Sequence, residues 1–178
     1  MAKIRFATVW LDGCSGCHMS FLDMDERLID LAQKVEVVCS PYVDTKGFPE
    51  KVDLTLVEGS ISSEEDLEKI HKIRKNSKLI VALGDCAVTG NVSAMRNLVG
   101  LEAALHHAYD ELSDFNKGCR PCRVVPDQLE RVMPLHEAVK IDHFLPGCPP
   151  PADAIHHLLT CLIEGKEPTI FDYTRFGK

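Results

Sequence analysis

The chain has 178 residues, of which 45% are hydrophobic and 26% are charged, and its formal net charge is −7. These proportions are ordinary for a soluble globular protein, and the length predicts one domain with a substantial core. The negative charge disfavours non-specific binding to nucleic acid or anionic membranes, and no apolar run reaches the roughly 20 residues that a membrane-spanning helix needs.

Predicted strands alternate with predicted helices along the sequence. We expect strands at residues 4–10, 35–39, 53–57, 78–83 and 139–145. We expect helices at residues 19–32, 64–76, 98–109 and 152–164. Either Ser62 or Ser63 can serve as the N-cap of the second helix.

This alternation predicts an α/β fold, with a flavodoxin-like doubly wound parallel sheet and helices on both faces. We expect a single domain over residues 1–178, with an irregular insertion at about 110–134, where glycine, proline and mixed charges interrupt the pattern. Ligands of such sheets bind outside the carboxyl ends of the strands.

The N-terminus and the cysteines indicate the cellular compartment of the protein. The chain runs from Met1 directly into a predicted strand without an apolar targeting region, so no cleaved leader is expected. We therefore expect a cytoplasmic protein, in which the eight cysteines are thiols and metal ligands rather than disulfides.

Four cysteines follow predicted strands, in three glycine-containing loops. Cys14 and Cys17 lie in Leu-Asp-Gly-Cys-Ser-Gly-Cys, Cys86 lies in Gly-Asp-Cys, and Cys148 lies in Pro-Gly-Cys-Pro-Pro. Because the strand ends of a parallel sheet lie along one edge, these thiolates are expected to converge. Four converging thiolates are the usual ligands of an iron–sulfur cluster.

Other interpretations of these cysteines stay open at this point. Cys14-x-x-Cys17 alone could be a thioredoxin-type redox pair, although the glycines around it allow backbone amides to approach the sulfur atoms. Zinc also binds thiolates, but structural zinc sites usually use compact paired knuckles rather than three scattered loops. Four unrelated buried cysteines are the remaining alternative.

Four motifs, taken together and in this order, resemble the small subunit of nickel–iron hydrogenases over about residues 3–165. They are Cys14-Ser-Gly-Cys17, Glu58-Gly-Ser-Ile61, Gly84-Asp-Cys-Ala87 and Pro146-Gly-Cys-Pro-Pro150. The resemblance implies one 4Fe-4S cluster whose iron is bound by Cys14, Cys17, Cys86 and Cys148. It also implies a nickel–iron centre in a separate large subunit that docks against this edge of the sheet.

A narrower resemblance is to the small subunit of cytoplasmic NAD-reducing hydrogenases. The chain ends about 30 residues after Cys148, without the further C-terminal domain of most hydrogenase small subunits, and it contains Gly16-Cys-His-Met-Ser-Phe-Leu-Asp23. The resemblance implies an electron-transfer subunit that relays electrons from dihydrogen through its cluster. It also implies diaphorase subunits, carrying FMN and further clusters, that reduce NAD. Neither nucleic acid nor a membrane is implied as a partner.

Two other functions are alternatives. The quinone-coupled iron–sulfur subunit of respiratory complex I shares the fold and the Pro-Gly-Cys-Pro-Pro string, but it typically has adjacent cysteines where this chain has Cys14-x-x-Cys17. The second alternative is a flavodoxin-like scaffold module with incidental cysteines. FMN bound to this chain is a weaker option, because no Ser/Thr- and Gly-rich phosphate loop follows the first predicted strand. A Gly-x-Gly-x-x-Gly motif for direct NAD binding is also absent.

Glu58 and His18 are further candidate site residues. Glu58 ends a predicted buried strand, where its carboxylate could relay protons near the metal site, cap the helix that follows, or pair with the partner subunit. His18 follows Cys17 and could hydrogen-bond a cluster sulfur, which would tune the cluster potential.

The remaining cysteines are not expected to be ligands of this cluster. Cys119 and Cys122 form a Cys-x-x-Cys motif in the irregular insertion, which departs from the family pattern. Alone, the motif supplies half of a tetrahedral metal site, and it could equally be a redox pair. Cys39 and Cys161 do not lie in matching loops.

Overall fold

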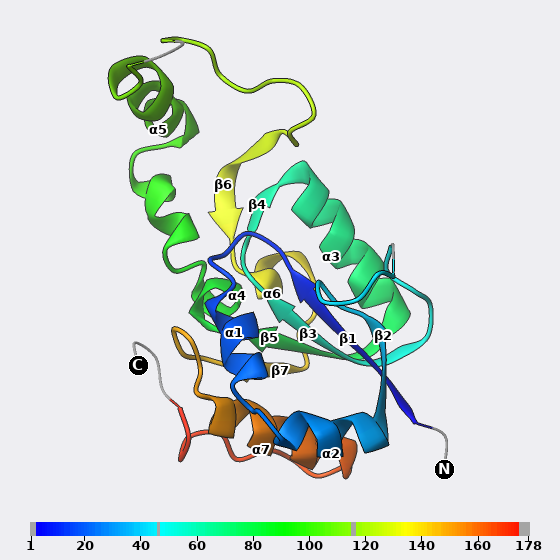
Figure 1. Ribbon diagram of the computed structural model, residues 1–178. Helices are drawn as coiled ribbons and strands as arrows, with labels where there is room; N and C mark the ends of the chain where they lie inside the picture. Colours follow the sequence, from blue (N-terminus) through cyan, green and yellow to red (C-terminus); the bar gives the residue numbers. More distant parts are fainter. Residues whose placement is uncertain (1–2, 46, 115–116, 175–178) are drawn as a thin grey trace.

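The computed structural model describes residues 3–45, 47–114 and 117–174. Its centre is a five-stranded sheet in the order β2-β1-β3-β5-β7, in which every strand pair is parallel (Figure 1). The strands are β1 (Ile4–Trp10), β2 (Val35–Cys39), β3 (Val52–Glu58), β5 (Ser77–Leu83) and β7 (His143–Leu145). This order is that of a flavodoxin-like doubly wound sheet and confirms the predicted fold class.

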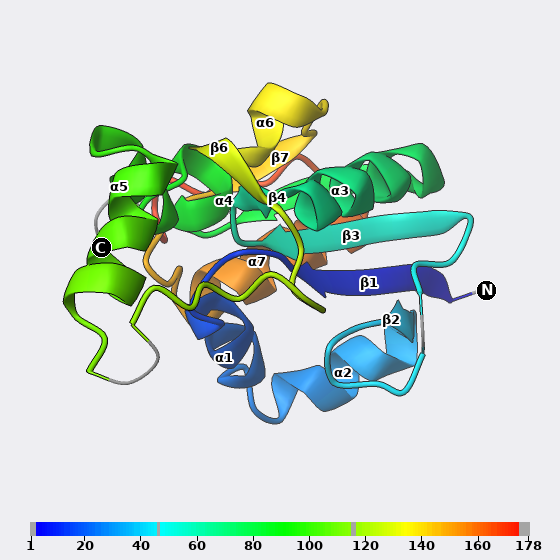
Figure 2. The same ribbon diagram turned by 90° about the horizontal axis from the view of Figure 1, so that it is seen from above.

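Helices cover both faces of the sheet (Figure 2). One face carries α1 (Gly16–Leu22), α2 (Arg27–Lys34) and α7 (Ala152–Ile163), and the other carries α3 (Glu64–Asn76), α4 (Asp85–Thr89) and α6 (Leu135–Ala138). Side chains alternate along the strands. Leu56 and Val81 therefore pack in the core between the sheet and α1, α2 and α7, whereas Val57 and Ile80 pack in the core between the sheet and α3, α4 and α6. Within the described ranges, no helix is both long enough and apolar enough to cross a membrane.

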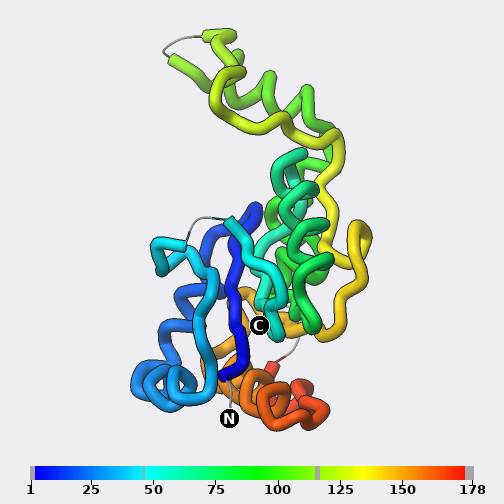
Figure 3. Tube along the Cα trace, turned by 90° about the vertical axis from the view of Figure 1, so that its right-hand side faces the viewer, coloured from blue at the N-terminus to red at the C-terminus, as the bar shows by residue number. Residues whose placement is uncertain are grey.

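A second, two-stranded sheet pairs β4 (Ile61–Ser63) with β6 (Gln128–Met133) in antiparallel fashion. Three further helical segments lie between these strands in sequence: the 3-10 helix η1 (Ser93–Leu98), α5 (Leu101–His106) and the π-helix η2 (His107–Glu111). Figures 1 and 3 show α5, η2 and the segment that returns to β6 projecting beyond the main sheet. We call this projection the arm.

Two predicted helices are divided in the structure. The helix expected at 19–32 is split into α1 and α2, and Asp25, between them, has a φ of 50°, outside helical geometry. The helix expected at 98–109 is split among η1, α5 and η2, with Gly100 at a φ of 88° before α5. Apolar spacing indicated helix in both regions, but it did not indicate these interruptions.

Two strands also differ from expectation. The strand expected at 139–145 is regular only in its last three residues, which form β7. Just before them, the side chain of Asp142, rather than a backbone carbonyl, accepts the hydrogen bond from the Ile80 amide at 2.9 Å. The stretch at 110–134, expected to be irregular, ends in β6. That strand pairs with β4 rather than with the main sheet.

Ser63 begins α3, as one of the two predicted caps. Its hydroxyl accepts a hydrogen bond from the Asp66 amide at 3.2 Å, and the Asp66 carboxylate accepts one from the Ser63 amide at 3.1 Å. This reciprocal capping box satisfies two backbone donors and fixes the start of the helix. The cap therefore also fixes the short segment between β3 and α3.

Candidate metal centre

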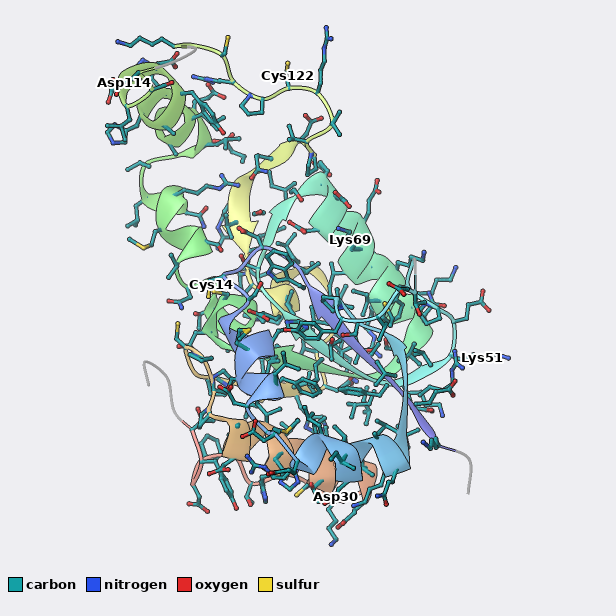
Figure 4. All side chains as sticks on the ribbon, viewed as in Figure 1. Cys14, Asp30, Lys51, Lys69, Asp114 and Cys122 are labelled. Carbon is teal, nitrogen blue, oxygen red and sulfur yellow. The ribbon has the colours of Figure 1, made fainter. Side chains whose placement is uncertain are left out.

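All four predicted ligands lie at the carboxyl ends of the parallel strands. Cys14 is in the loop after β1, Cys17 is in the first turn of α1, Cys86 is in the first turn of α4, and Cys148 is in the loop between β7 and α7. Figure 4 labels Cys14 at this edge. The parallel sheet thus gathers the three loops in the way the sequence predicted.

The four thiols lie close enough to interact electrostatically. The pKa of Cys17 is raised far above its ordinary value, first by burial and then by the Glu58 carboxylate. The three other thiolates, those of Cys86, Cys14 and Cys148, raise it further. Burial also raises the pKa of Cys86. Since four neighbouring thiolates repel one another, this arrangement favours an occupant that carries positive charge.

The backbone fixes the Cys14 loop to the end of β3. The Asp12 amide donates to the Ser60 carbonyl at 3.1 Å, and the Ser60 amide donates to the Asp12 carbonyl at 2.7 Å. Gly59 has a φ of 94°, and a β-carbon at this position would lie 2.8 Å from the Asp12 oxygen. Only glycine allows this approach, which explains the glycine in the Glu58-Gly-Ser motif.

Asp85 joins the Cys86 loop to the Cys148 loop. Its amide donates to the Gly147 carbonyl at 2.9 Å, and its Oδ1 accepts from the Gly147 amide at 2.7 Å. Ser20, in α1, donates to the Pro150 carbonyl at 2.6 Å. The loop of Pro-Gly-Cys-Pro-Pro is therefore held from two sides.

Glycines line the space around the thiols. A β-carbon at Gly84, where φ is 83°, would lie 2.2 Å from the Cys17 sulfur, and one at Gly16 would lie 3.3 Å from the Cys14 sulfur. Side chains at these positions would displace the thiols. A glycine-lined cradle with four thiolates fits an iron–sulfur cluster, in which each iron takes one cysteine.

A single metal ion fits these donors less well. Across residues 3–45, 47–114 and 117–174, no three His, Cys, Asp or Glu side chains lie close enough to hold one ion. A tetrahedral zinc ion needs each sulfur at about 2.3 Å. A cluster instead offers a separate iron to each thiolate, so the four sulfurs need not converge on one ion.

Glu58 lies beneath the first turn of α1, and it is only 2% exposed. Its carboxylate accepts hydrogen bonds from the amides of Cys17 at 3.3 Å and His18 at 2.9 Å. Glu58 therefore caps the helix that precedes β3 in sequence rather than the one that follows, which Ser63 caps. Its role as a proton relay stays a prediction.

His18 is 2% exposed and is paired through Nδ1 with the Glu58 carboxylate. Its other ring nitrogen, Nε2, is buried and has no hydrogen-bond partner among the described residues. The edge of the ring meets Tyr42, with centroids 5.9 Å apart. The predicted hydrogen bond from His18 to a cluster sulfur stays a prediction.

Asn91 is a site residue that sequence reasoning missed. Its Nδ2 donates to the Cys148 sulfur at 3.4 Å, and a hydrogen bond from the same side chain to Cys86 opposes the rise in the pKa of that thiol. Asn91 has a φ of 35°, in the region of positive φ that asparagine tolerates. The Gly90-Asn91 pair shortly after Cys86 is the signal that could have indicated it.

The site opens to the surface. Cys17 is buried and Cys86 is partly buried, whereas Cys14 and Cys148 are exposed. Trp10 and Met19, near Cys14 and Cys17 in sequence, are 47% and 57% exposed. Exposed large apolar side chains beside a functional site are typical of a surface that another protein covers.

The remaining cysteines lie elsewhere. Cys119 and Cys122 are exposed on the arm, and Figure 4 shows Cys122 well separated from Cys14. Cys39 ends β2, and Cys161 lies in α7. The arm therefore carries a second pair of thiols that is distinct from the four at the edge of the sheet.

Comparisons with known proteins show the family of this chain. The family described as NADH ubiquinone oxidoreductase, 20 Kd subunit, matches residues 14–162. The delta subunit of NAD-reducing hydrogenase HoxS from Cupriavidus necator is 42% identical over 168 residues, which cover 92% of this chain and 80% of that protein. One subunit of the F420-non-reducing hydrogenase vhu from Methanocaldococcus jannaschii is 38% identical over 94% of this chain, which spans only 58% of that longer protein.

This chain is also similar to one chain of a solved hydrogenase structure. One chain of the crystal structure of NAD+-reducing NiFe-hydrogenase in the H2-reduced state superposes with a TM-score of 0.92 and 39% sequence identity. The match covers 98% of this chain and 99% of that one. The chain therefore belongs to the NADH ubiquinone oxidoreductase 20 Kd subunit family, as a small subunit of the NAD-reducing nickel–iron hydrogenase type.

Proposed function

We propose that this chain is the electron-transfer subunit of a nickel–iron hydrogenase that reduces NAD. In this proposal Cys14, Cys17, Cys86 and Cys148 hold one 4Fe-4S cluster. A bound cluster of this kind takes up and releases one electron at a time. The whole chain, residues 1–178, acts as one iron–sulfur-binding domain.

The observation that carries the proposal is that three loops bring Cys14, Cys17, Cys86 and Cys148 to one edge of the sheet. There the Cys17 sulfur lies against Gly84, and Asn91 donates a hydrogen bond to the Cys148 sulfur at 3.4 Å. Placing thiolates where they repel one another costs stability unless a shared cation neutralises them. The glycine cradle at Gly84 supports the same conclusion, because it leaves room for sulfur where most residues would place a side chain.

The similarity of this chain to hydrogenase subunits supports two kinds of partner, a large subunit and diaphorase subunits. We propose that dihydrogen is split at a nickel–iron centre in a large subunit, which covers the opening beside Cys14 and Cys148. Diaphorase subunits that carry FMN and further clusters then receive the electrons and reduce NAD. The proposal places FMN in those subunits rather than in this chain, and it places the assembly in the cytoplasm without nucleic acid or membrane partners.

Glu58 is the residue that we propose for proton relay at this edge. Support comes from its burial at the end of β3 and from its pairing with the His18 ring. Glu58→Gln should lower hydrogen turnover while the iron content is retained, because the amide oxygen can still accept the shorter hydrogen bond, from the His18 amide, but the side chain cannot carry a proton. Unchanged turnover would contradict this role.

The electron-transfer function is tested with Cys148→Ser in the anaerobically purified complex. We expect hydrogen-dependent NAD reduction to fall to background, while hydrogen–deuterium exchange at the nickel–iron centre persists because that centre lies in the large subunit. Cys161→Ser is the matched control, since this cysteine lies in α7 outside the site. NAD reduction that survives in Cys148→Ser would reject the proposal.

A further inference from the structure

The arm contains an extended segment that the proposed electron path does not use. This strap, residues 117–127, leads back to β6 and has no helix or strand. Arg120 fastens it to the arm helices by ion pairs with Glu102 at 2.7 Å and with Asp110 at 3.3 Å. The Gly118 amide also donates to the Tyr109 carbonyl at 3.0 Å, so the strap is anchored to the arm helices on either side of Cys119.

Cys119 and Cys122 are both free and exposed on this strap. Free cysteine is among the most often buried residue types, so two exposed thiols so close together call for an explanation. In the sequence, Arg120 lies between the two cysteines and Arg123 follows Cys122 directly. Thiol–disulfide exchange requires that the attacking thiol be accessible, a condition that both cysteines meet.

The strap also forms one wall of a cleft of about 590 Å³. Pro121 and Cys122 line the strap side, and Leu105 and Tyr109 line the side of the arm helices. Small-molecule sites typically have volumes of about 300–1,000 Å³. Cys122 therefore borders a space that is large enough to seat a small thiol compound.

The backbone next to this pair is strained. Val124 has a φ of 68°, and its side chain is fully exposed. A β-branched residue in the left-handed region is an outlier that persists only where its surroundings hold it. Closing a ring between Cys119 and Cys122 would give the strap a second, covalently defined conformation.

We propose that Cys119 and Cys122 form a thiol–disulfide exchange site for a glutathione-type disulfide. The Cys122 thiolate attacks one sulfur of the disulfide, which forms a mixed disulfide and releases one glutathione. The Cys119 thiolate then attacks the Cys122 sulfur, which closes the ring and releases the second glutathione. The two cysteine thiols lose two electrons and two protons, which end on the two glutathione thiols.

The test uses the intact complex, purified anaerobically, with oxidised glutathione as the probe. After incubation, the remaining thiols are alkylated and the chain is mapped by peptide mass spectrometry. We expect Cys119 and Cys122 to be protected, joined and lighter by two hydrogens, and dithiothreitol should reverse the change. In Cys119→Ser the second step is blocked, so a glutathione adduct should accumulate on Cys122. Cys161→Ser should leave ring closure unchanged.

Three results would overturn this proposal. Both thiols could stay fully open to alkylation, or the wild-type chain could retain glutathione on each cysteine without closing the ring. The third is bound zinc that is lost in Cys119→Ser, which would make the pair half of a metal site. The iron content of this chain is measured in parallel and should not change in Cys119→Ser, so failure here is distinguishable from failure of the cluster assignment.

Discussion

The thiol of Cys17 occupies the space that a β-carbon on Gly84 would need, since such a carbon would lie 2.2 Å from the sulfur atom. This contact packs the first turn of α1 against the loop that carries Cys86. Burial of the Cys17 thiol and its closeness to the other thiols both depend on it. Gly84 is therefore as much a part of the site as the cysteines are.

Gly84→Ala should disrupt the site. The new methyl group would force the Cys17 thiol away, so we expect loss of iron from the chain and a lower unfolding temperature. Gly100→Ala is the matched control, because Gly100 has a similar φ of 88° but no atom within 4 Å of an added β-carbon. The control should cost only the backbone strain of about 1–3 kcal/mol. Equal iron loss in both variants would show that strain, rather than the clash, is responsible.

Asn91→Gly should lower the reduction potential of the proposed cluster. The Asn91 amide donates to the Cys148 sulfur at 3.4 Å, and such hydrogen bonds stabilise the more negative, reduced form. A hydrogen bond worth about 1 kcal/mol corresponds to about 40 mV for one electron. Glycine removes the donor and tolerates the positive φ at this position. A redox titration followed by electron paramagnetic resonance measures the potential, and a higher value would contradict the assignment.

Glu58→Gln should shift the potential in the opposite direction. The Glu58 carboxylate is buried next to Cys17 and raises the pKa of that thiol, so its charge also disfavours added negative charge on the cluster. Glutamine keeps one acceptor oxygen, which can serve the His18 amide, while it removes the charge. The same titration should therefore show a higher potential. A lower potential would contradict the expected effect of the Glu58 charge on the reduction potential.

Asp142 should make the free energy of unfolding depend on pH in the acidic range. Burial alone would raise the pKa of Asp142, but hydrogen bonds from Arg74 at 2.7 Å and from the Ile80 amide at 2.9 Å lower it overall. Because the folded pKa lies below the unfolded value of 3.8, this stabilisation is complete above that value and is lost as the pH falls through the folded pKa. Asp142→Asn should lower the free energy of unfolding at pH 7 by about 1–3 kcal/mol.

Asp153→Asn is the control for that experiment. Asp153 pairs with Arg27 at 2.7 Å, but its side chain is 74% exposed, so its loss should change stability by less than about 1 kcal/mol. Denaturant unfolding between pH 3 and pH 7 compares the two variants. If Asp142→Asn matched the control at pH 7, the Arg74 contact would contribute nothing measurable.

The sequence predicted the edge of the sheet well, because its signals there are local. Glycine and proline strings mark the loops of Cys14, Cys86 and Cys148, and alternating strands and helices imply that these loops share one edge. The part that Glu58 plays was harder to predict. Its acceptor role toward α1 depends on how that helix packs over β3, which no local pattern encodes.

Asn91 and β6 were missed for related reasons. The contact between Asn91 and the Cys148 sulfur joins residues 57 positions apart, and it arises only when two loops meet. The strand β6 has no regular core-facing alternation, since Val132 is its one buried residue, and its pairing partner β4 is a three-residue segment. Tertiary pairing, rather than intrinsic propensity, defines such strands.

The most direct test of the account is the iron and acid-labile sulfide content of this chain, separated anaerobically from its co-expressed complex. One cluster on the four cysteines predicts about four of each per chain. Essentially none, from an otherwise intact complex, would contradict the electron-transfer role. About eight of each would show a second cluster and would contradict the single-cluster assignment.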